Sequence, residues 1–231
     1  MTVRVAIIVA AGRGSRMGAP DKVLLELAGE PCLVWSLRAA DAAATVSGIV
    51  VVHGEHTQER IAALAAGAGL RLPVSLAEGG ERRQDSVANG LAAARALGAR
   101  VVAVHDGARP LATPAMFDAA LDAAERHGAA IVATPVVDTL KRAAAGMVIE
   151  TVPREGLWAA QTPQAFALDR LSEALAEGER RGLTVTDEAA LFEALGWPVA
   201  IAAGDPANLK LTHPADAPVL AALLRAREVQ E

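Results

Sequence analysis

Short apolar runs rich in β-branched residues alternate with alanine-rich stretches of helical spacing, and this alternation restricts the fold more than any other feature. The apolar runs have the length of buried strands: Val3–Ala10, Gly48–His53, Leu72–Leu76, Val101–His105 and Ala130–Thr134. The stretches between most of them have the length of helices: Leu33–Ala42, Glu55–Ala66, Asp85–Leu97 and Pro114–Arg126. Such alternation is typical of an α/β fold with a mostly parallel, twisted sheet and helices on both faces. The crossovers are expected to be right-handed.

The alternation stops after Thr134. Residues 138–158 show no helical period, and Gly146 marks a turn inside them, so we expect an extended β-hairpin arm that leaves the main sheet. Regular patterns return afterwards, with helices at Leu168–Arg181, Asp187–Leu195 and about Pro214 to Arg227, and a strand at Pro198–Ala202. Because there is no repeat, linker or shift in composition, residues 1–231 are expected to form a single domain that carries this arm.

Composition excludes several classes of protein. Hydrophobic residues make up 52% of the chain and charged residues 21%, which indicates a packed core rather than disorder. A net charge of −5 argues against non-specific binding to nucleic acid. No apolar run reaches the roughly 18 residues that span a bilayer, and no signal peptide is apparent. The single cysteine, Cys32, excludes an internal disulfide. We therefore expect a cytoplasmic protein that binds neither nucleic acid nor membrane.

The first predicted strand runs directly into a glycine-rich segment, Ala10-Ala11-Gly12-Arg13-Gly14-Ser15-Arg16-Met17-Gly18, which Asp21-Lys22 follows. Ligands of open α/β sheets bind at the carboxyl ends of strands. Glycines let the backbone approach a phosphate, and successive N–H groups form a nest for an anion. Because Arg13, Arg16 and Lys22 add three positive charges, the segment favours a triphosphate over a neutral ligand.

Two other interpretations of this segment remain open. A dinucleotide-binding fingerprint would fit Gly12 and Gly14, but it places Met17 at the third glycine and His53 where an acidic residue is expected. A plain turn with solvated arginines is the other, although three glycines and three cations within eleven residues are many for a turn. The P-loop pattern is absent.

The segment resembles the signature of the sugar-nucleotide pyrophosphorylase fold, a Rossmann-like nucleotidyltransferase fold. Further segments are similar, in order, to those of the 2-C-methyl-D-erythritol 4-phosphate cytidylyltransferase family: Glu78–Val87, His105–Pro110, Pro135–Arg142, Gln161–Gln164, Thr186–Ala189 and Asn208–Thr212. The similarity covers essentially the whole chain. It departs at Asp21-Lys22-Val23-Leu24, where the family commonly has Pro-Lys-Gln and an aromatic residue, and at Ala207, where an acidic residue is common.

The resemblance implies that 2-C-methyl-D-erythritol 4-phosphate attacks the α-phosphorus of CTP, giving 4-diphosphocytidyl-2-C-methyl-D-erythritol and pyrophosphate on the non-mevalonate route to isoprenoid precursors. A phosphate monoester has a second pKa of about 6, so this nucleophile needs no general base. The enzyme must instead bring two anions together and stabilise the charge at the α-phosphorus. Mg²⁺ is expected as cofactor, held mainly by the CTP phosphates, with Asp106 as the nearest carboxylate of the protein.

The resemblance also implies three groups of site residues. The catalytic cations are Arg16, Lys22 and Lys210. The nucleotide-binding residues are Ala10, Ala11, Gly12, Gly14, Gly80, Glu81 and Ser86. The substrate-binding residues are Asp106, Arg109, Thr139, Arg154 and Thr162, of which Thr139 and Arg154 lie on the predicted arm. In the family this arm crosses to a second subunit, so a homodimer joined through residues 138–158 is expected.

Structural roles compete with some of these assignments. Asp85-Ser86 is also typical of a helix cap, Asp106 of a turn before Gly107, and Thr186-Asp187-Glu188 of a helix start with a capping threonine. The histidines His53, His56, His127 and His213 show no ligand-like clustering. Alternative functions are a ribitol 5-phosphate cytidylyltransferase, a transferase that uses another nucleotide, and a non-catalytic nucleotide-binding regulator. The joint presence of Arg16, Lys22, Asp106 and Lys210 argues against the regulator.

Overall fold

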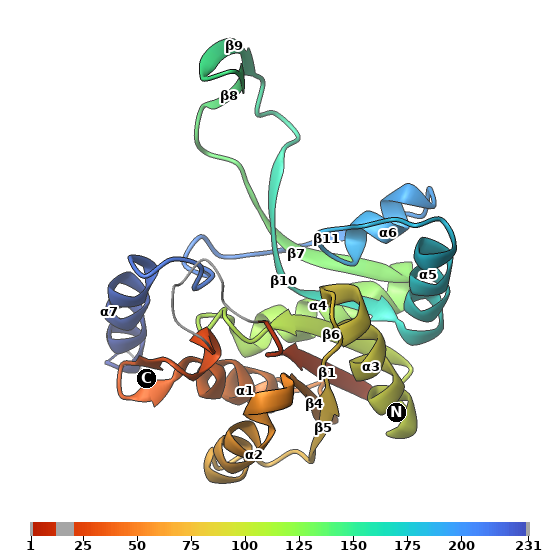
Figure 1. Cartoon of the computed structure of the whole chain (residues 1–231), viewed down its shortest axis with the longest axis vertical. Helices are drawn as coiled ribbons and strands as arrows, with labels where there is room; N and C mark the ends of the chain where they lie inside the picture. Colours follow the sequence, from red (N-terminus) through yellow and green to blue (C-terminus); the bar gives the residue numbers. More distant parts are fainter. Residues whose placement is uncertain (1, 13–20, 230–231) are drawn as a thin grey trace.

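A seven-stranded sheet forms the centre of the computed structural model, which describes residues 2–12 and 21–229 (Figure 1). Its strand order is β11-β7-β10-β6-β1-β4-β5. The strands are β1 (Arg4–Val9), β4 (Gly48–His53), β5 (Val74–Glu78), β6 (Val101–Asp106), β7 (Ala129–Pro135), β10 (Trp158–Ala167) and β11 (Ala200–Ala203). Strand β10 runs antiparallel to β6 and β7, and the other pairings in this sheet are parallel. The predicted, mostly parallel sheet is confirmed.

Helices cover both faces, because alternate side chains of each strand point to opposite sides of the sheet. On β1, Ala6 and Ile8 belong to one buried cluster, whereas Val5 and Ile7 belong to the other. The first cluster includes residues of α1 (Cys32–Ala42), α2 (Gln58–Gly67), α4 (Pro114–His127) and α7 (Asp216–Glu228). The second includes residues of α3 (Arg83–Ala96), α5 (Leu168–Arg180) and α6 (Ala189–Ala194). None of the helices in the described ranges is long and apolar enough to cross a membrane.

Local sequence explains where α4 begins and ends. The Thr113 hydroxyl accepts a hydrogen bond from the N–H of Met116 at 3.3 Å, and Pro114 occupies the first helical position. Gly128 then ends the helix with a φ of +89°, which glycine adopts without steric cost. The predicted helix at Pro114–Arg126 is confirmed within one residue.

Strand β10 was not predicted, although it lies in the middle of the sheet between β6 and β7. The sequence of this strand does not look like that of a buried strand, because polar residues and a proline interrupt its apolar pattern at Gln161, Thr162, Pro163 and Gln164. Pro163 has no N–H to donate, and the pairing with β7 shifts register between Ala160 and Gln164. The three polar side chains are buried and hydrogen-bonded to other segments. These hydrogen bonds offset the cost of burying polar groups inside the sheet.

The predicted arm is present as a separate two-stranded sheet of β8 (Leu140–Ala144) and β9 (Met147–Val152). Ala145 and Gly146 connect the two strands with φ angles of 49° and 79°, the conformation that tight hairpin turns require. Figure 1 shows the arm projecting from the body on the extended segments that leave β7 and enter β10. The side chains of Met147, Val148 and Ile149 are 73%, 64% and 61% exposed.

Several short elements were not predicted. They are the 3-10 helix η2 (Lys22–Leu24) and the two-stranded pair of β2 (Glu26–Leu27) and β3 (Glu30–Pro31). The predicted helix at Glu55–Ala66 is present as the 3-10 helix η3 (Glu55–Thr57) followed directly by α2. The other helix starts that differ do so by one or two residues: α1 begins at Cys32 rather than Leu33, α3 at Arg83 rather than Asp85, α6 at Ala189 rather than Asp187, and α7 at Asp216 rather than about Pro214.

Candidate active site

The parallel strands β1, β4, β5 and β6 all end on the same side of the sheet, and we call the row of their carboxyl ends the edge of the sheet. A cavity of about 350 Å³ opens there and is called the edge cavity. Eight of the predicted site residues line it: Ala11, Gly12, Lys22, Gly80, Glu81, Ser86, Asp106 and Lys210. A second cavity of about 780 Å³ shares Ala11, Gly80 and Glu81 with the first and adds Ala10. The tertiary structure thus joins segments from opposite ends of the sequence. Gly14 and Arg16 lie outside the described residues.

The wall predicted to hold the nucleotide is made of closely spaced backbone. A Cβ atom on Gly79 would lie 2.3 Å from the Cβ of Ala11, and one on Gly80 would lie 2.3 Å from the Cβ of Asp85. The N–H of Gly80 donates to the Ser86 hydroxyl at 3.0 Å, and this hydroxyl donates to the carbonyl of Arg82 at 3.2 Å. Only glycine fits at these two positions, so the loop after β5 can lie directly against the loop after β1 at Gly79 and against the start of α3 at Gly80.

Asp85 and Ser86 differ in their local roles. The carboxylate of Asp85 accepts from the N–H of Arg82 at 3.0 Å, which is the helix-capping contact made from the third position of α3. Ser86 lies one residue further into the helix and is 3% exposed. The predicted capping role therefore belongs to Asp85 alone, and Ser86 links the helix to Gly80.

Three charged side chains that line the cavity are linked to one another, and the last of them also pairs with a fourth, buried one. Lys210 forms an ion pair with one oxygen of Asp106, and Arg83 reaches the other oxygen at 3.2 Å. Arg83 also pairs with Glu188. Burial alone would raise the pKa of Asp106, but the positive charges of Arg83 and Lys210 outweigh it and hold that pKa well below its usual range. Asp106 is therefore an ionised anchor for two cations, which is more than a turn residue before Gly107 would be.

Arg83 and Glu188 were missed by the sequence analysis. The segment 186–188 was predicted to start a helix with a capping threonine, but Asp187 supplies the contact instead, accepting from the N–H of Ala190 at 3.1 Å. Glu188 is fully buried rather than a solvated first-turn acid, and burial raises its pKa, although Arg83 opposes this. Within the described residues, one of its carboxylate oxygens has no hydrogen-bond partner. A single sequence carries no signal for this pairing, because it depends on how α3 faces residue 188.

The two predicted catalytic lysines, Lys22 and Lys210, are far apart in the sequence but line the same cavity. Lys22 comes from η2, and its ammonium group donates to the carbonyl oxygen of Leu211 at 2.9 Å. Leu211 is the residue after Lys210, and its own N–H donates to the carbonyl of Ala108 at 2.8 Å. The C-terminal segment at 210–211 therefore connects Lys22 to the turn that follows β6.

The predicted acceptor residues are divided between two places. Arg109 and Thr162 lie beside Asp106: Arg109 donates to the carbonyl of Asn208 at 2.7 Å, and Thr162 accepts from the N–H of Asp106 at 3.1 Å. The Nε of Arg109 is buried and has no partner among the described residues, and burial lowers the pKa of this guanidinium. Thr139 and Arg154 instead lie exposed at the base of the arm, where Arg154 bonds to the carbonyl of Val137.

Two further buried polar residues support this region and were not assigned a role in the sequence. Asn208 donates from Nδ2 to the carbonyl of Thr162 at 3.0 Å and to the side chain of Gln161 at 3.2 Å. His105 is fully buried in β6, and burial lowers its pKa to about 4. Both residues lie in segments that resemble the family, His105–Pro110 and Asn208–Thr212. Their closeness in sequence to Asp106 and Lys210 could have identified them as part of the site.

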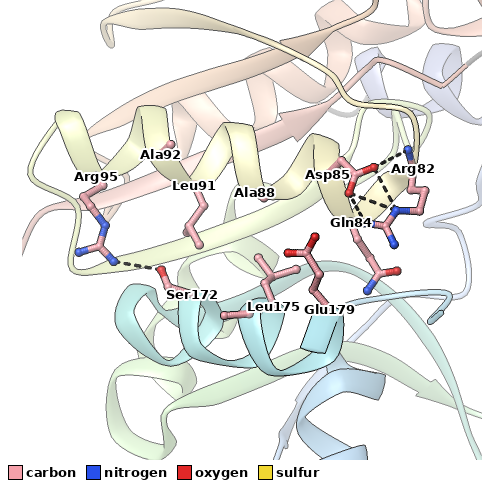
Figure 2. A pocket seen from close by; sticks show the side chains of 11 residues that line it. Arg82, Gln84, Asp85, Ala88, Leu91, Ala92, Arg95, Ser172, Leu175 and Glu179 are labelled. Atoms are coloured by element: carbon pink, nitrogen blue, oxygen red, sulfur yellow. Dashed lines mark hydrogen bonds and ion pairs between the residues drawn. The ribbon is translucent and has the colours of Figure 1, made fainter. Parts of the chain in front are cut away.

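A third cavity, of about 390 Å³, lies between α3 and α5 (Figure 2). Leu91 and Leu175 face each other in its middle, and Arg82 and Arg95 lie toward its two ends, paired with Asp85 and Ser172. Among the described residues that line it, none is a predicted site residue. We therefore place the candidate active site at the sheet edge.

The residues of the edge cavity fit a metal ion only in a limited way. Across residues 2–12 and 21–229, no cluster of three or more His, Cys, Asp or Glu side chains could hold an ion. Asp106 supplies a hard oxygen donor in the cavity wall, and Glu81 is a second carboxylate there. This donor set suits Mg²⁺ that keeps water and phosphate ligands, and it does not form a complete protein cage.

Comparison with known proteins agrees with this geometry. A sequence model of the 2-C-methyl-D-erythritol 4-phosphate cytidylyltransferase family (IspD) matches residues 4–226. A protein of that name from Parasynechococcus marenigrum is 47% identical over 224 residues, covering 96% of this chain and 98% of the relative. A relative from Gloeobacter violaceus is 45% identical over 228 residues, covering 97% of each chain.

Solved structures give the same result. The crystal structure of a 2-C-methyl-D-erythritol 4-phosphate cytidylyltransferase from Thermus thermophilus is 34% identical, with a TM-score of 0.76 over 95% of this chain and 98% of that one. A 4-diphosphocytidyl-2C-methyl-D-erythritol synthase from Anaerococcus prevotii is 27% identical, with a TM-score of 0.83 over 97% of this chain and 99% of that one. The chain therefore belongs to the 2-C-methyl-D-erythritol 4-phosphate cytidylyltransferase family.

Proposed function

We propose that this chain transfers the cytidylyl group of CTP to 2-C-methyl-D-erythritol 4-phosphate, giving 4-diphosphocytidyl-2-C-methyl-D-erythritol and pyrophosphate for isoprenoid precursor synthesis. The observation that carries the proposal is the edge cavity. Its lining combines three cations, Lys22, Lys210 and Arg83, with the closely packed backbone of the loops after β1 and β5. Positive charge and bare amide groups at one place suit a reaction in which two phosphate groups must meet. We place this reaction in the cytoplasm, where both substrates would be available.

The backbone wall supports CTP as the nucleotide. We assign base recognition to Ala10, Ala11, Gly80, Glu81 and Ser86, and contacts to the ribose and phosphates to Gly12 and Gly14. Gly79 brings the loop after β5 against Ala11, and Gly80 brings it against the start of α3, so backbone groups gather beside Ser86 and suit recognition of a pyrimidine by hydrogen bonds. Amide groups that remain unpaired beside a wrong base would be costly.

The lysines support the chemical step. The α-phosphorus gains negative charge during attack, and Lys22, Lys210 and Arg16 are assigned to stabilise it. Lys210 pairs with Asp106 through an ammonium group that has three N–H donors, so it can contact a phosphate of CTP as well. Arg83 holds the other oxygen of Asp106 and keeps this carboxylate in place beside Lys210. Mg²⁺, held mainly by the CTP phosphates, would supply further positive charge close to Asp106.

The division of the acceptor residues supports a homodimer in which residues 1–231 form a single nucleotidyltransferase domain and its arm, residues 138–158, joins the two subunits. The guanidinium of Arg109 lies close to Asp106, and its planar set of N–H donors suits bidentate binding of the acceptor phosphate. Thr139 and Arg154 lie on the arm. We propose that the arm of one subunit brings these two residues to the cavity of the other, because its apolar residues Met147, Val148 and Ile149 are exposed in a single chain.

The experiment is a panel of CTP, UTP, ATP and GTP crossed with 2-C-methyl-D-erythritol 4-phosphate and ribitol 5-phosphate, read by pyrophosphate release with Mg²⁺. We expect release only with CTP and the first acceptor, and its loss when EDTA removes the metal. Turnover with ribitol 5-phosphate alone would replace the proposal by the alternative transferase, and nucleotide binding without any turnover would favour a regulator.

A matched pair of variants tests the assignment of the lysines. Lys22→Ala is expected to lower turnover on the order of 10²–10³-fold, the loss typical of removing one preorganised donor. Arg225→Ala removes a cation from the exposed side of α7 and should leave turnover unchanged. Turnover of Lys22→Ala within threefold of the unmodified enzyme would show that the lysine has no part in the chemical step.

A further inference from the structure

His105 has no part in the mechanism above, although it lies in β6 directly before Asp106 and is fully buried. Its ring lies 5.0 Å from the ring of Phe117, and both ring nitrogens have polar partners. Nδ1 lies 3.1 Å from the hydroxyl oxygen of Thr162, and Nε2 lies 3.3 Å from the carbonyl oxygen of Arg109. The ring therefore contacts a residue of β10 and the far end of the turn after β6.

The partners determine which ring nitrogen carries the proton. A carbonyl oxygen can only accept, so Nε2 must be the donor to Arg109. Neither hydrogen-bond partner carries a negative charge, and burial disfavours the charged ring more than the neighbouring carboxylate of Asp106 favours it, so the ring is neutral. A neutral ring has one proton, so Nδ1 is an acceptor, and the hydroxyl of Thr162 donates its only proton to it. The same hydroxyl oxygen accepts from the N–H of Asp106 at 3.1 Å.

These contacts hold the turn after β6 at both ends. The turn closes on itself through the N–H of Arg109, which donates to the carbonyl of Asp106 at 2.9 Å. Thr162 holds the N–H at its start, and His105 holds the carbonyl at its end. Because this turn carries Asp106 and Arg109, a change in either contact would move the partner of Lys210 and the proposed phosphate ligand together.

We propose that His105 is a positioning residue of this enzyme, and that it commits the Thr162 hydroxyl to holding the Asp106–Arg109 turn. Thr162 then has no proton to donate to the acceptor phosphate, so its expected role as a direct phosphate ligand is replaced by an internal one. The proposal rests on the proposed function for its kinetic consequence, whereas the hydrogen-bond pattern is independent of that function.

The first test needs no variant and no substrate. Nitrogen-15 NMR of uniformly labelled protein reports which nitrogen of His105 is protonated. We expect a neutral ring with its proton on Nε2 at pH 7. A proton on Nδ1, or on both nitrogens, would overturn the proposal, and this result is independent of whether the chain has cytidylyltransferase activity.

The second test is a double-variant cycle on kcat/KM. His105→Phe and Thr162→Val each remove the contact between the two residues, and each is expected to lower kcat/KM by roughly 10–100-fold, as misplacement of reacting groups does. The double variant should lose little more than either single variant, because both act on one chain of hydrogen bonds. Losses that multiply in the double variant would show that Thr162 acts independently, as a direct phosphate ligand would.

Conservative variants separate positioning from packing. His105→Asn places an acceptor near the position of Nδ1 and should recover most of the activity that His105→Phe loses, although it fills less of the core. His105→Gln can place a donor near Arg109 but leaves Thr162 without its acceptor, so it should recover less. Equal activity of the Asn and Gln variants would contradict the role of Nδ1, and urea unfolding of all variants identifies any loss caused by unfolding.

Discussion

Arg82 and Arg83 are neighbours of the same chemical type, yet they have different surroundings. The side chain of Arg82 is 50% exposed and pairs with Asp85 in the same helix. The side chain of Arg83 is 27% exposed and pairs with the fully buried Glu188 and with Asp106. Exposed pairs contribute little to stability, whereas removal of one partner from a buried pair leaves a charge without compensation. The two arginines therefore differ in their energetic importance.

We expect Arg83→Ala to lower the free energy of unfolding by about 3 kcal/mol at pH 7, because Glu188 would remain buried without its counter-charge. Arg82→Ala, the matched control, should change the free energy of unfolding far less, because its ion pair with Asp85 is exposed to solvent. Urea unfolding followed by circular dichroism measures both. Equal losses in the two variants would mean that the buried Arg83–Glu188 pair contributes no more to the free energy of unfolding than the exposed Arg82–Asp85 pair.

The same variant has an expected pH dependence. Burial raises the pKa of Glu188, and Arg83 opposes that rise, so removing Arg83 should raise it further. A carboxyl with a raised pKa in the folded state binds more protons than in the unfolded state, so stability falls as pH rises. The stability lost in Arg83→Ala should therefore be larger at pH 7 than at pH 5. A constant difference between these pH values would contradict the assignment to Glu188.

At the scale of elements, helix α3 carries Arg83 and Ser86 and must lie close against the sheet. Gly90 makes this approach possible, since a Cβ atom there would lie 2.6 Å from the side chain of Ile7 and 2.8 Å from that of Val52. Gly67 at the end of α2 has open space around it. The two helical glycines therefore predict opposite effects for the same substitution.

We expect Gly90→Ala to be destabilising by about 1 kcal/mol, because overpacking costs roughly 1–3 kcal/mol and exceeds the gain of up to about 1 kcal/mol in helix propensity. Gly67→Ala should be neutral or stabilising, since only the propensity changes. Urea unfolding of both variants compares them directly. A stabilised Gly90→Ala would show that α3 does not pack as closely on β1 and β4 as described.

At the scale of the whole molecule, the arm is the part that a single chain leaves without a packing partner. An isolated two-stranded hairpin is only marginally stable in water, and three consecutive apolar residues of β9 are exposed here. A second copy of the chain would cover them. This would also explain why Thr139 and Arg154 lie outside the cavity of their own chain.

We expect Ile149→Asp to shift the protein from dimer to monomer in sedimentation velocity at micromolar concentration, because a charge would be buried in the interface. Its KM for the acceptor should rise at least tenfold, while its KM for CTP stays within threefold. Val219→Asp alters an exposed apolar residue of α7 and should change neither property. A monomeric Ile149→Asp variant with unchanged kinetics would exclude a site shared between subunits.

The sequence alone determined the alternating fold and the arm, and its resemblance to the family indicated the segments that meet at the edge of the sheet. Period, turn chemistry and spacing are local properties, and parallel strands necessarily bring their carboxyl ends together. Only the tertiary structure showed that β10 is a central strand, that Arg83 rather than Arg82 reaches Asp106, and that Glu188 and His105 are buried beside the site. Those features depend on which side of each element faces its neighbours, and burial and pairing between segments far apart in the chain leave no periodic trace in the sequence.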